Sequence, residues 1–160
     1  MIWQTNSTGS EDTERLGELL GRRLRGGEVL ELRSDLGGGK TTFVRGLVRG
    51  AGCHDRVSSP TFTLSRVYKA KDFEIHHFDF YRLSDAGILA EQLSEVINDN
   101  QVVVVEWADI VEDVLPKERL TILLELTAAS PDERRITITY TDNYQQPIAE
   151  VESDWVEVEP

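Results

Sequence analysis

The chain has 160 residues, of which 39% are hydrophobic, and a formal net charge of −12. This length is typical of one domain with one sizeable core. No apolar run approaches the ~18 residues that cross a bilayer, and the first residues lack the features of a secretion signal, so we expect a cytoplasmic protein. The single cysteine, Cys53, excludes an internal disulfide and is expected to be a buried or incidental thiol.

The acidic net charge also bears on the partners of the protein. Proteins that bind nucleic acid through many phosphates present a basic face, so we do not expect this chain to bind RNA stably on its own. Arginines crowd the first third of the chain, and acidic residues crowd its end. Two interpretations stay open: solvated helix faces with a frayed acidic tail from about residue 142, or a docking surface for a protein partner.

The first predicted elements are a helix and a strand. Residues 10–13 combine a capping serine with early acidic side chains, and leucines follow at helical spacing up to residue 24. Two glycines at 26–27 end this helix. Apolar side chains then alternate over residues 28–33, which predicts a strand.

The segment after this strand is the most informative in the chain, and it reads SDLGGGKTT over residues 34–42. A glycine-rich loop turns backbone N–H groups toward an anion, Lys40 can reach the outer phosphates, and the Thr41 hydroxyl can hold Mg²⁺. A glycine-rich turn before an amphipathic helix is the alternative, but it explains neither Lys40 nor Thr41. We therefore predict a nucleoside triphosphate site formed by Asp35, Leu36, Gly37, Gly38, Gly39, Lys40, Thr41 and Thr42.

Ser34 is the one defect in this loop, because it stands where the pattern GxxxxGK(S/T) has its first glycine. It lies at the end of the strand rather than against the phosphates, so it narrows the backbone angles without breaking the loop. The helix that follows covers residues 41–50 and turns Phe43, Leu47 and Val48 toward the sheet.

Residues 57–81 predict a loop followed by a hairpin. Two alternating segments, 61–68 and 73–81, are separated by Lys-Ala-Lys-Asp, which is a hairpin signal. In the loop before them, Pro60 keeps its neighbour extended, and the hydroxyls of Ser59 and Thr61 are candidates to sense a γ-phosphate, as in a switch segment. A plain turn before a strand is the alternative.

The second strand of this hairpin ends in His-Phe-Asp-Phe-Tyr-Arg at residues 77–82. Strand alternation puts Asp79 and the two phenylalanines on opposite faces. Asp79 is a candidate to orient an attacking water or to contact Mg²⁺ through water, and the phenylalanines fit the core. We assign no chemistry to the histidines at 76–77. Arg82 has two equal interpretations, a cation that neutralises the γ-phosphate and a surface ion pair.

A helix is predicted after residues 84–85, and a strand with four consecutive valines follows at residues 101–106. Such an unbroken apolar run is typical of a strand buried on both faces of a parallel sheet. Ligands bind at the carboxyl ends of these strands, so Glu106 should emerge beside Thr41 and hold Mg²⁺ directly or through water. An ordinary carboxylate at the end of a strand is the alternative.

Two further strands, at residues 120–126 and 135–140, complete the predicted elements, with Pro131 in a turn between them. No internal repeat and no long linker marks a second domain. We therefore predict a single domain over residues 1–160.

Five segments in this order resemble the TsaE family, formerly YjeE, of small bacterial ATPases in tRNA threonylcarbamoyladenosine synthesis: SDLGGGKTTFVRGL, VSSPTFTL, HFDFYRL, VVVVEW and a following Leu115-Pro116. The resemblance covers roughly residues 10–140. It implies an α/β fold of the P-loop NTPase type, a three-layer sandwich with a mixed, mainly parallel central sheet. It also implies ATP and Mg²⁺ as cofactors.

The resemblance implies a role for single residues as well. Lys40, Asp79 and Glu106 would be catalytic, and Thr41 and Glu106 would hold the metal. Trp107 would lie beside the nucleotide. Thr13 near the first helix start and Arg134 after the turn at Pro131 resemble contacts on the adenine side.

The implied partners are the TsaB and TsaD proteins. TsaD would transfer the carbamoyl group to adenosine 37 of tRNAs that read codons beginning with A. This chain would contact tRNA only indirectly, through the complex. No residue is assigned as a cationic finger, so we expect slow hydrolysis alone and faster turnover with partners. Three departures from the family pattern are Ser34 for glycine, Gly38 for alanine, and the sequence of residues 87–96.

Other functions compete with this interpretation. A small-molecule P-loop kinase needs an acceptor site and an arginine-bearing lid, and the sequence offers no such lid between residues 109 and 127. A signalling GTPase needs an NKxD guanine reader, which the chain lacks. An ATP-gated adaptor with negligible hydrolysis is the more serious rival, because the missing first glycine can leave binding intact.

Overall fold

The computed structural model describes residues 1–35, 37–60, 63–98 and 100–156. Its helices are α1 (Ser10–Gly21), α2 (Lys40–Gly50), α3 (Gly87–Val96) and α4 (Gln145–Val156), with short 3₁₀ turns η1 (Ala108–Val111) and η2 (Asp142–Tyr144). Its strands are β1 (Ile2–Ser7), β2 (Val29–Arg33), β3 (Ser65–Lys69), β4 (Glu74–Asp79), β5 (Val102–Glu106), β6 (Leu120–Leu126) and β7 (Arg134–Thr139).

The strands form one sheet in the order β1-β7-β6-β2-β5-β4-β3. The four middle strands, β6, β2, β5 and β4, run parallel, whereas β1, β7 and β3 pair antiparallel with their neighbours. The predicted α/β fold with a mixed sheet is therefore confirmed. Its parallel part is the centre, where the carboxyl ends of β2, β5 and β4 meet at one edge.

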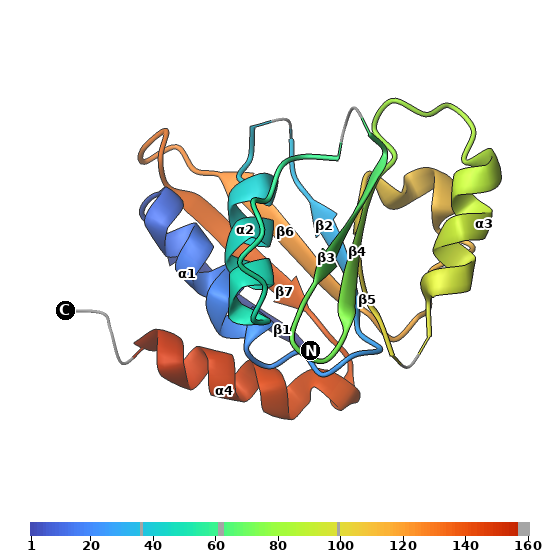
Figure 1. Ribbon diagram of the computed structural model, residues 1–160. Coiled ribbons are helices and arrows are strands. Elements are labelled where there is room, and N and C mark those ends of the chain that lie inside the picture. Colours follow the sequence, from blue (N-terminus) through green and yellow to red (C-terminus); the bar gives the residue numbers. More distant parts are fainter. Residues whose placement is uncertain (36, 61–62, 99, 157–160) are drawn as a thin grey trace.

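Two helical layers cover the sheet (Figure 1). The larger apolar cluster packs side chains of α1, α2 and α4, including Leu16, Phe43 and Val151, against alternate residues of the strands. The smaller cluster packs Leu93 of α3 and Val111 of η1 against Val103 and other residues of the opposite face. These layers confirm the three-layer sandwich that was expected.

The central strands and the helices that flank them match the sequence predictions. The four-valine segment is β5, buried along its whole length, and the predicted hairpin is the β3–β4 pair. The predicted core side chains Phe43, Leu47 and Val48 are buried. Cys53 is also buried, and this burial raises the pKa of its thiol.

The structure differs from the sequence predictions at both ends. The β1 edge strand was not predicted, because its side chains are mostly polar and exposed. The sequence predicts a frayed acidic tail from about residue 142, and this prediction is wrong. The segment forms η2 and α4, because Ile148, Val151 and Trp155 lie on one helical face and are buried against the core. The first helix ends at Gly21, before the predicted glycine pair.

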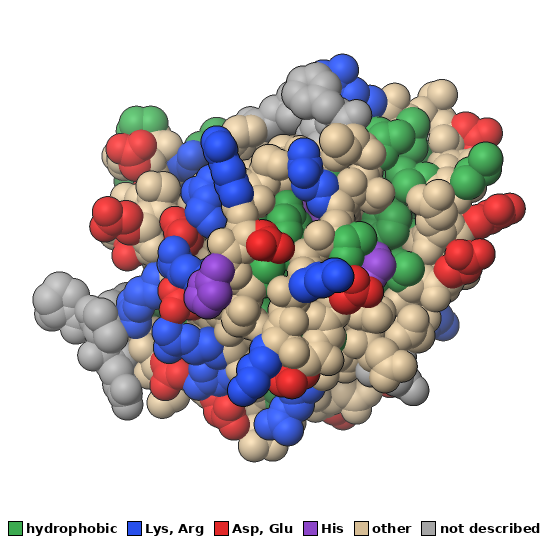
Figure 2. All heavy atoms as spheres, viewed as in Figure 1, with side chains coloured by type: hydrophobic (Ala, Val, Ile, Leu, Met, Phe, Trp, Pro, Cys, Tyr) green, Lys and Arg blue, Asp and Glu red, His purple; other side chains and the backbone are tan. Residues whose placement is uncertain are grey.

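Basic side chains are prominent on the face that carries α1, α2 and the β3–β4 hairpin (Figure 2). Several of them are engaged within the chain. Arg23 pairs with Glu150 and Asp154 of α4, and Arg15 lies 5.0 Å above the centre of the Trp155 ring. The acidic end and the basic first third thus partly neutralise each other, which favours the interpretation as ordinary helix faces.

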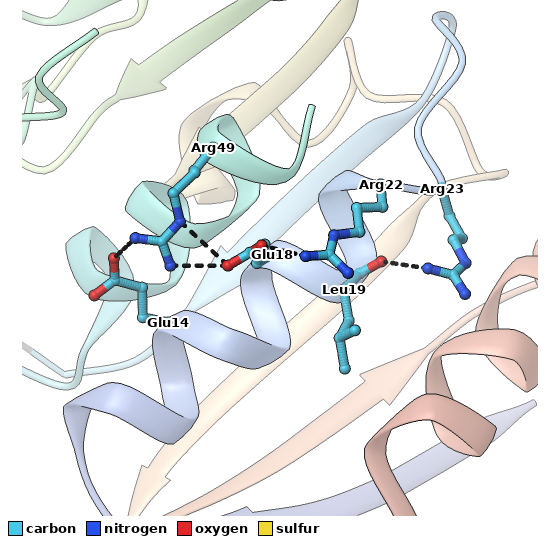
Figure 3. Close-up of polar contacts among 6 residues, drawn as sticks. All are labelled: Glu14, Glu18, Leu19, Arg22, Arg23 and Arg49. Carbon is cyan, nitrogen blue, oxygen red and sulfur yellow. Dashed lines mark hydrogen bonds and ion pairs between the residues drawn. The ribbon is translucent and has the colours of Figure 1, made fainter. Parts of the chain in front are cut away.

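Helices α1 and α2 approach each other closely through glycines. A Cβ atom on Gly46 would lie 1.9 Å from the Glu14 carbonyl oxygen, and one on Gly17 would lie 2.2 Å from the Phe43 carbonyl oxygen. Ion pairs flank this contact: Arg49 binds both Glu14 and Glu18, and Glu18 also binds Arg22 (Figure 3). The two helices form a closely packed pair beside the site described below.

Among the described residues, no helix combines the length and apolar character needed to cross a bilayer. The cytoplasmic location expected from the sequence stays a prediction.

Candidate functional site

The glycine loop, residues 34–39, joins the end of β2 to the first turn of α2. Gly37 has φ 77° and Gly39 has φ 101°, which are left-handed conformations that favour glycine. Gly39 is the N-cap of α2, and no side chain of the described residues caps this helix end. The N–H groups at the start of α2 are therefore available to an anion, as the sequence predicts.

An inner cavity of about 260 Å³ lies against this loop. It is lined by Gly37, Gly38, Gly39, Lys40, Thr41, Thr42, Ser59, Asp79, Glu106 and Trp107. Three of the lining side chains, those of Lys40, Asp79 and Glu106, are the predicted catalytic set. Asp79 and Glu106 are register partners at the carboxyl ends of β4 and β5, which explains why the fold brings them together.

Lys40 is held by the loop itself. Its Nζ atom donates to the carbonyl oxygens of Ser34, at 3.1 Å, and Asp35, at 3.4 Å. It also lies 4.9 Å from the centre of the Trp107 ring, a distance within the range of a cation–π contact. The ammonium group is thus already positioned at the inner cavity, and a phosphate oxygen can replace the carbonyl partners.

Trp107 adopts an uncommon backbone conformation. It has φ 56° and ψ 53°, the left-handed region that bulky residues rarely enter. Its ring contacts Tyr81, with 4.8 Å between ring centres. Such strained residues concentrate at functional sites, and this one lies directly after Glu106 at the wall of the inner cavity.

Asp79 is fixed by its backbone surroundings. Its N–H donates to the Leu64 carbonyl at 2.9 Å, and its Oδ1 accepts a 2.9 Å hydrogen bond from the Tyr81 N–H. The residue is 2% exposed. A carboxylate held in this way keeps a defined orientation, as water positioning requires.

Glu106 has a partner that the sequence analysis missed. Its Oε2 atom lies 2.7 Å from Nε2 of His77, and both residues are buried. The sequence analysis assigns no chemistry to His77, because a structural or surface histidine is more common than a ligand. The available signal was strand alternation, which puts His77 on the same face of β4 as Asp79.

The residues present fit a magnesium ion. The Thr41 hydroxyl and the Glu106 carboxylate line the same cavity and supply the hard oxygen ligands that Mg²⁺ prefers. Among the described residues, no group of three or more His, Cys, Asp or Glu is arranged to hold a metal. This does not count against Mg²⁺, which commonly uses one or two protein ligands together with phosphates and waters.

An outer cavity of about 520 Å³ adjoins the inner one and shares Gly37, Gly39 and Thr42 with it. Thr13 and Arg134, the predicted adenine-side residues, both line it, together with Thr8, Gly9, Ser10, Glu11, Asp12 and Asp132. Arg134 Nε donates to the Gly38 carbonyl at 3.2 Å, so this arginine also supports the glycine loop. The hydroxyls of Thr13 and Ser7 are 2.7 Å apart in a buried pair.

Asp35 and Leu36 are the remaining predicted residues of the loop. Asp35 lines neither the inner nor the outer cavity but a groove of about 470 Å³ that also contains Ser34, Trp107 and Leu126. Leu36 lies outside the described residues.

The candidate switch segment is only partly described. Ser59 lines the inner cavity, whereas Thr61 lies outside the described residues. The Tyr68 hydroxyl donates to the Ser58 carbonyl at 3.2 Å, which attaches the loop to β3. The role of Ser59 as a phosphate sensor stays a prediction.

A buried carboxylate supports the strand beneath the glycine loop. Glu31 of β2 is 1% exposed and binds Arg33 at 2.7 Å and Arg119 at 2.9 Å. Burial alone would raise the pKa of the Glu31 carboxyl, but the two arginines outweigh burial and hold this pKa below its ordinary value of about 4.5.

The chain is similar to known proteins along most of its length. The family model "Threonylcarbamoyl adenosine biosynthesis protein TsaE" matches residues 7–136, which span both cavities. The tRNA threonylcarbamoyladenosine biosynthesis protein TsaE of Bacillus subtilis is 37% identical over 150 residues, covering 92% of this chain and 90% of that protein. Its namesake from Treponema pallidum is 37% identical over 133 residues, covering 82% and 96%. A crystal structure of Bacillus subtilis YdiB matches with a TM-score of 0.77 and 31% identity, covering 96% of each chain.

Proposed function

Because this chain belongs to the TsaE family, whose role is in tRNA threonylcarbamoyladenosine biosynthesis, we propose that it is the Mg²⁺-dependent subunit of that pathway that binds and hydrolyses ATP. The modified position would be adenosine 37 of tRNAs that read codons beginning with A. TsaD and TsaB would be the partners, and this chain would contact tRNA only through the complex that they form.

One observation carries this proposal. The inner cavity joins the glycine loop, Lys40, Thr41, Asp79 and Glu106 at the carboxyl edge of the parallel strands. These groups supply the functions that phosphoryl transfer to water requires, which are anion binding, metal binding and water positioning.

The proposed roles follow from position and chemistry. Lys40 exchanges the carbonyl oxygens of Ser34 and Asp35 for oxygens of the outer phosphates. Thr41 and Glu106 would hold Mg²⁺, which when bound neutralises charge that develops between the two outer phosphates. Asp79 orients the attacking water.

The outer cavity is the proposed place of the nucleoside. Thr13 and Arg134 line it, whereas Glu106 and Asp79 line the inner cavity and not the outer one. A bound nucleotide would therefore lie across the loop, with its phosphates toward the inner cavity. Trp107 would neighbour the phosphate end.

Slow hydrolysis in the absence of partners is part of the proposal. Among the described residues that line the inner cavity, Lys40 is the one cation. Charge stabilisation by an arginine finger is worth 10³-fold or more. The same observation favours the rival function, an adaptor that binds ATP and hydrolyses negligibly.

A measurement of phosphate release from ATP distinguishes the ATPase from the adaptor. Purified protein should hydrolyse ATP at well under ~1 per second, and turnover should rise when TsaB and TsaD are added. Asp79→Asn keeps an oxygen for the Tyr81 N–H but loses the carboxylate charge. This variant should keep ATP affinity within about tenfold and lose turnover by ~100-fold.

Turnover that stays at background with and without the partners, together with intact ATP binding, would favour the adaptor. A collapse of ATP affinity in Asp79→Asn would instead make Asp79 a binding residue.

A further inference from the structure

His77 and Glu106 form a buried polar pair at the wall of the inner cavity. His77 is 0% exposed and Glu106 is 2% exposed. The distance from Nε2 to Oε2 is 2.7 Å. His77 lies in the middle of β4, in register with Val104, so it reaches diagonally to the last residue of β5.

The hydrogen bond fixes the position of the proton. An ionised carboxylate only accepts hydrogen bonds. Nε2 of His77 therefore carries a proton and donates the hydrogen bond to Glu106. The other ring nitrogen, Nδ1, is buried and has no hydrogen-bond partner among the described residues. A proton on Nδ1 would be a buried donor without an acceptor among these residues, so the geometry favours a ring with its proton on Nε2.

The partner of Glu106 is a histidine rather than an arginine. Glu31, the buried carboxylate of the neighbouring strand β2, is instead paired with Arg33 and Arg119, which neutralise it. A cationic partner would compete with a metal ion for Glu106. The His77 imidazole binds one carboxylate oxygen, Oε2, and leaves the other oxygen for a cation at the cavity.

A buried histidine lowers the stability of the fold at a position where an apolar side chain would be enough for packing. Its neighbours include the fully buried Val104 and Ile75, and a buried nitrogen without a partner destabilises the fold. An apolar side chain would fill this place without that cost. The unpaired nitrogen therefore indicates that the ring is kept for its Nε2–H group.

We infer, resting on the function proposed above, that His77 is a positioning residue that sets the Glu106 carboxylate for Mg²⁺. It acts through Glu106 and does not contact the nucleotide. Such outer partners of metal ligands typically change metal affinity by 10- to 100-fold.

The first test needs neither metal nor nucleotide. Imidazole ¹⁵N NMR of the metal-free protein should show His77 protonated at Nε2 and bare at Nδ1. Glu106→Gln should shift the Nε2–H signal of His77. A proton on Nδ1 in place of Nε2 would overturn the inference.

The second test compares two variants of similar shape. His77→Gln keeps a donor near the Nε2 position, and His77→Met has none. In binding assays with a non-hydrolysable ATP analogue, His77→Met should raise the half-saturating Mg²⁺ concentration by about 10- to 100-fold. His77→Gln should stay within about threefold of the natural protein. Binding of the analogue in EDTA should change by less than about twofold in both variants.

A double variant tests the route of the effect. On a Glu106→Gln background, His77→Met should cause no further loss of Mg²⁺ affinity. Circular dichroism and thermal unfolding check that each variant folds. Where His77→Met does not fold, His77→Asn replaces it, because its amide is too short to reach Glu106.

The two proposals fail in different ways. Binding of the analogue that is indifferent to Mg²⁺ in the natural protein would refute the magnesium part of the proposed function, and the role of His77 with it. Mg²⁺-dependent binding that His77→Met leaves unchanged would refute the role of His77 alone.

Discussion

Ser34 and Gly38 are close neighbours within the glycine loop. A Cβ atom on Gly38 would lie 1.7 Å from the Ser34 Oγ. The same hydroxyl donates to the Asp35 carbonyl at 2.7 Å, and the Gly38 N–H donates to that carbonyl at 3.0 Å. The serine thus occupies the space that an alanine at position 38 would need, so the side chains allowed at these two positions depend on each other.

The loop variants should therefore be non-additive. Gly38→Ala alone should destabilise the protein by roughly 1 to 3 kcal/mol through overpacking, whereas Ser34→Gly alone should preserve Mg²⁺-ATP binding. The double variant should recover most of the loss, with a coupling of at least about 1 kcal/mol. Thermal unfolding and ATP titration of the four proteins measure this, and additive effects would show that the two side chains are independent.

Glu31 gives a prediction for pH. Its lowered pKa means that its ion pairs contribute stability in full above about pH 5, and that this contribution is lost as the pH falls from about 4.5 through the lowered pKa. Glu31→Gln should cost roughly 1 to 3 kcal/mol at pH 7. Denaturant unfolding of both proteins between pH 3 and 7 checks the sign: the difference should shrink in acid, and a difference that grows would contradict the assignment.

At the scale of elements, the packing of α1 on α2 ties both cavities together. Helix α2 begins at the glycine loop, and the first turn of α1 lines the outer cavity. The helices meet backbone to backbone at Gly17, Gly21, Gly46 and Gly50. A change in the spacing of these helices should therefore alter both the affinity for nucleotide and the stability of the protein.

Gly46→Ala tests this coupling. Its methyl group would meet the Glu14 carbonyl at 1.9 Å, so we expect a loss of at least roughly 1 to 3 kcal/mol in stability together with weaker ATP binding. Ser94→Ala is the control, because Ser94 is an exposed residue of α3 that lines neither cavity. Chemical denaturation and calorimetry measure both quantities, and equal behaviour of the two variants would refute the tight contact.

The central elements could be predicted because each has a strong local pattern. Four valines identify β5, and the sequence of residues 34–42 identifies the strand–loop–helix unit. The edge strand β1 could not be predicted, because its stability comes from pairing with β7 rather than from an alternating pattern. Helix α4 was missed because acidic residues obscured the apolar face that contains Ile148, Val151 and Trp155.

The site was predictable to a similar extent. Lys40, Thr41, Asp79 and Glu106 were predicted together and do share one cavity, since topology brings strand ends to one edge. His77 was missed, because its partner lies 29 residues away and only the pairing of β4 with β5 brings them into contact. Asp35 lines a different groove, and its contact with the nucleotide stays a prediction.

At the scale of the whole molecule, the distribution of charge and the position of the inner cavity indicate where a partner would bind. The acidic helix α4 is held on the basic side of α1 by Arg15 and Arg23. The inner cavity has Asp79, Glu106 and the candidate switch residue Ser59 at its wall. Nucleotide state is therefore expected to be read by partners at the carboxyl edge of the sheet, where the γ-phosphate would lie.

Partner affinity should then depend on the nucleotide. Titrating the protein against a TsaB–TsaD complex with an ATP analogue and with ADP should give affinities that differ by about 1 to 3 kcal/mol. Ser59→Ala should reduce this difference. Equal affinities in the two nucleotides would remove the switch interpretation, and no binding in either would remove the proposed partnership.

Calorimetric titration of the protein with Mg²⁺-ATP is the most direct test of a nucleotide site built on the glycine loop. Lys40→Ala removes the ammonium group at the inner cavity, and Lys117→Ala removes an exposed lysine outside both cavities. We expect the natural protein and Lys117→Ala to bind alike, and Lys40→Ala to bind at least ~100-fold more weakly, the value of a charge-assisted contact of about 3 kcal/mol. Similar affinity in all three proteins, or no binding by the natural protein, would contradict the nucleotide site.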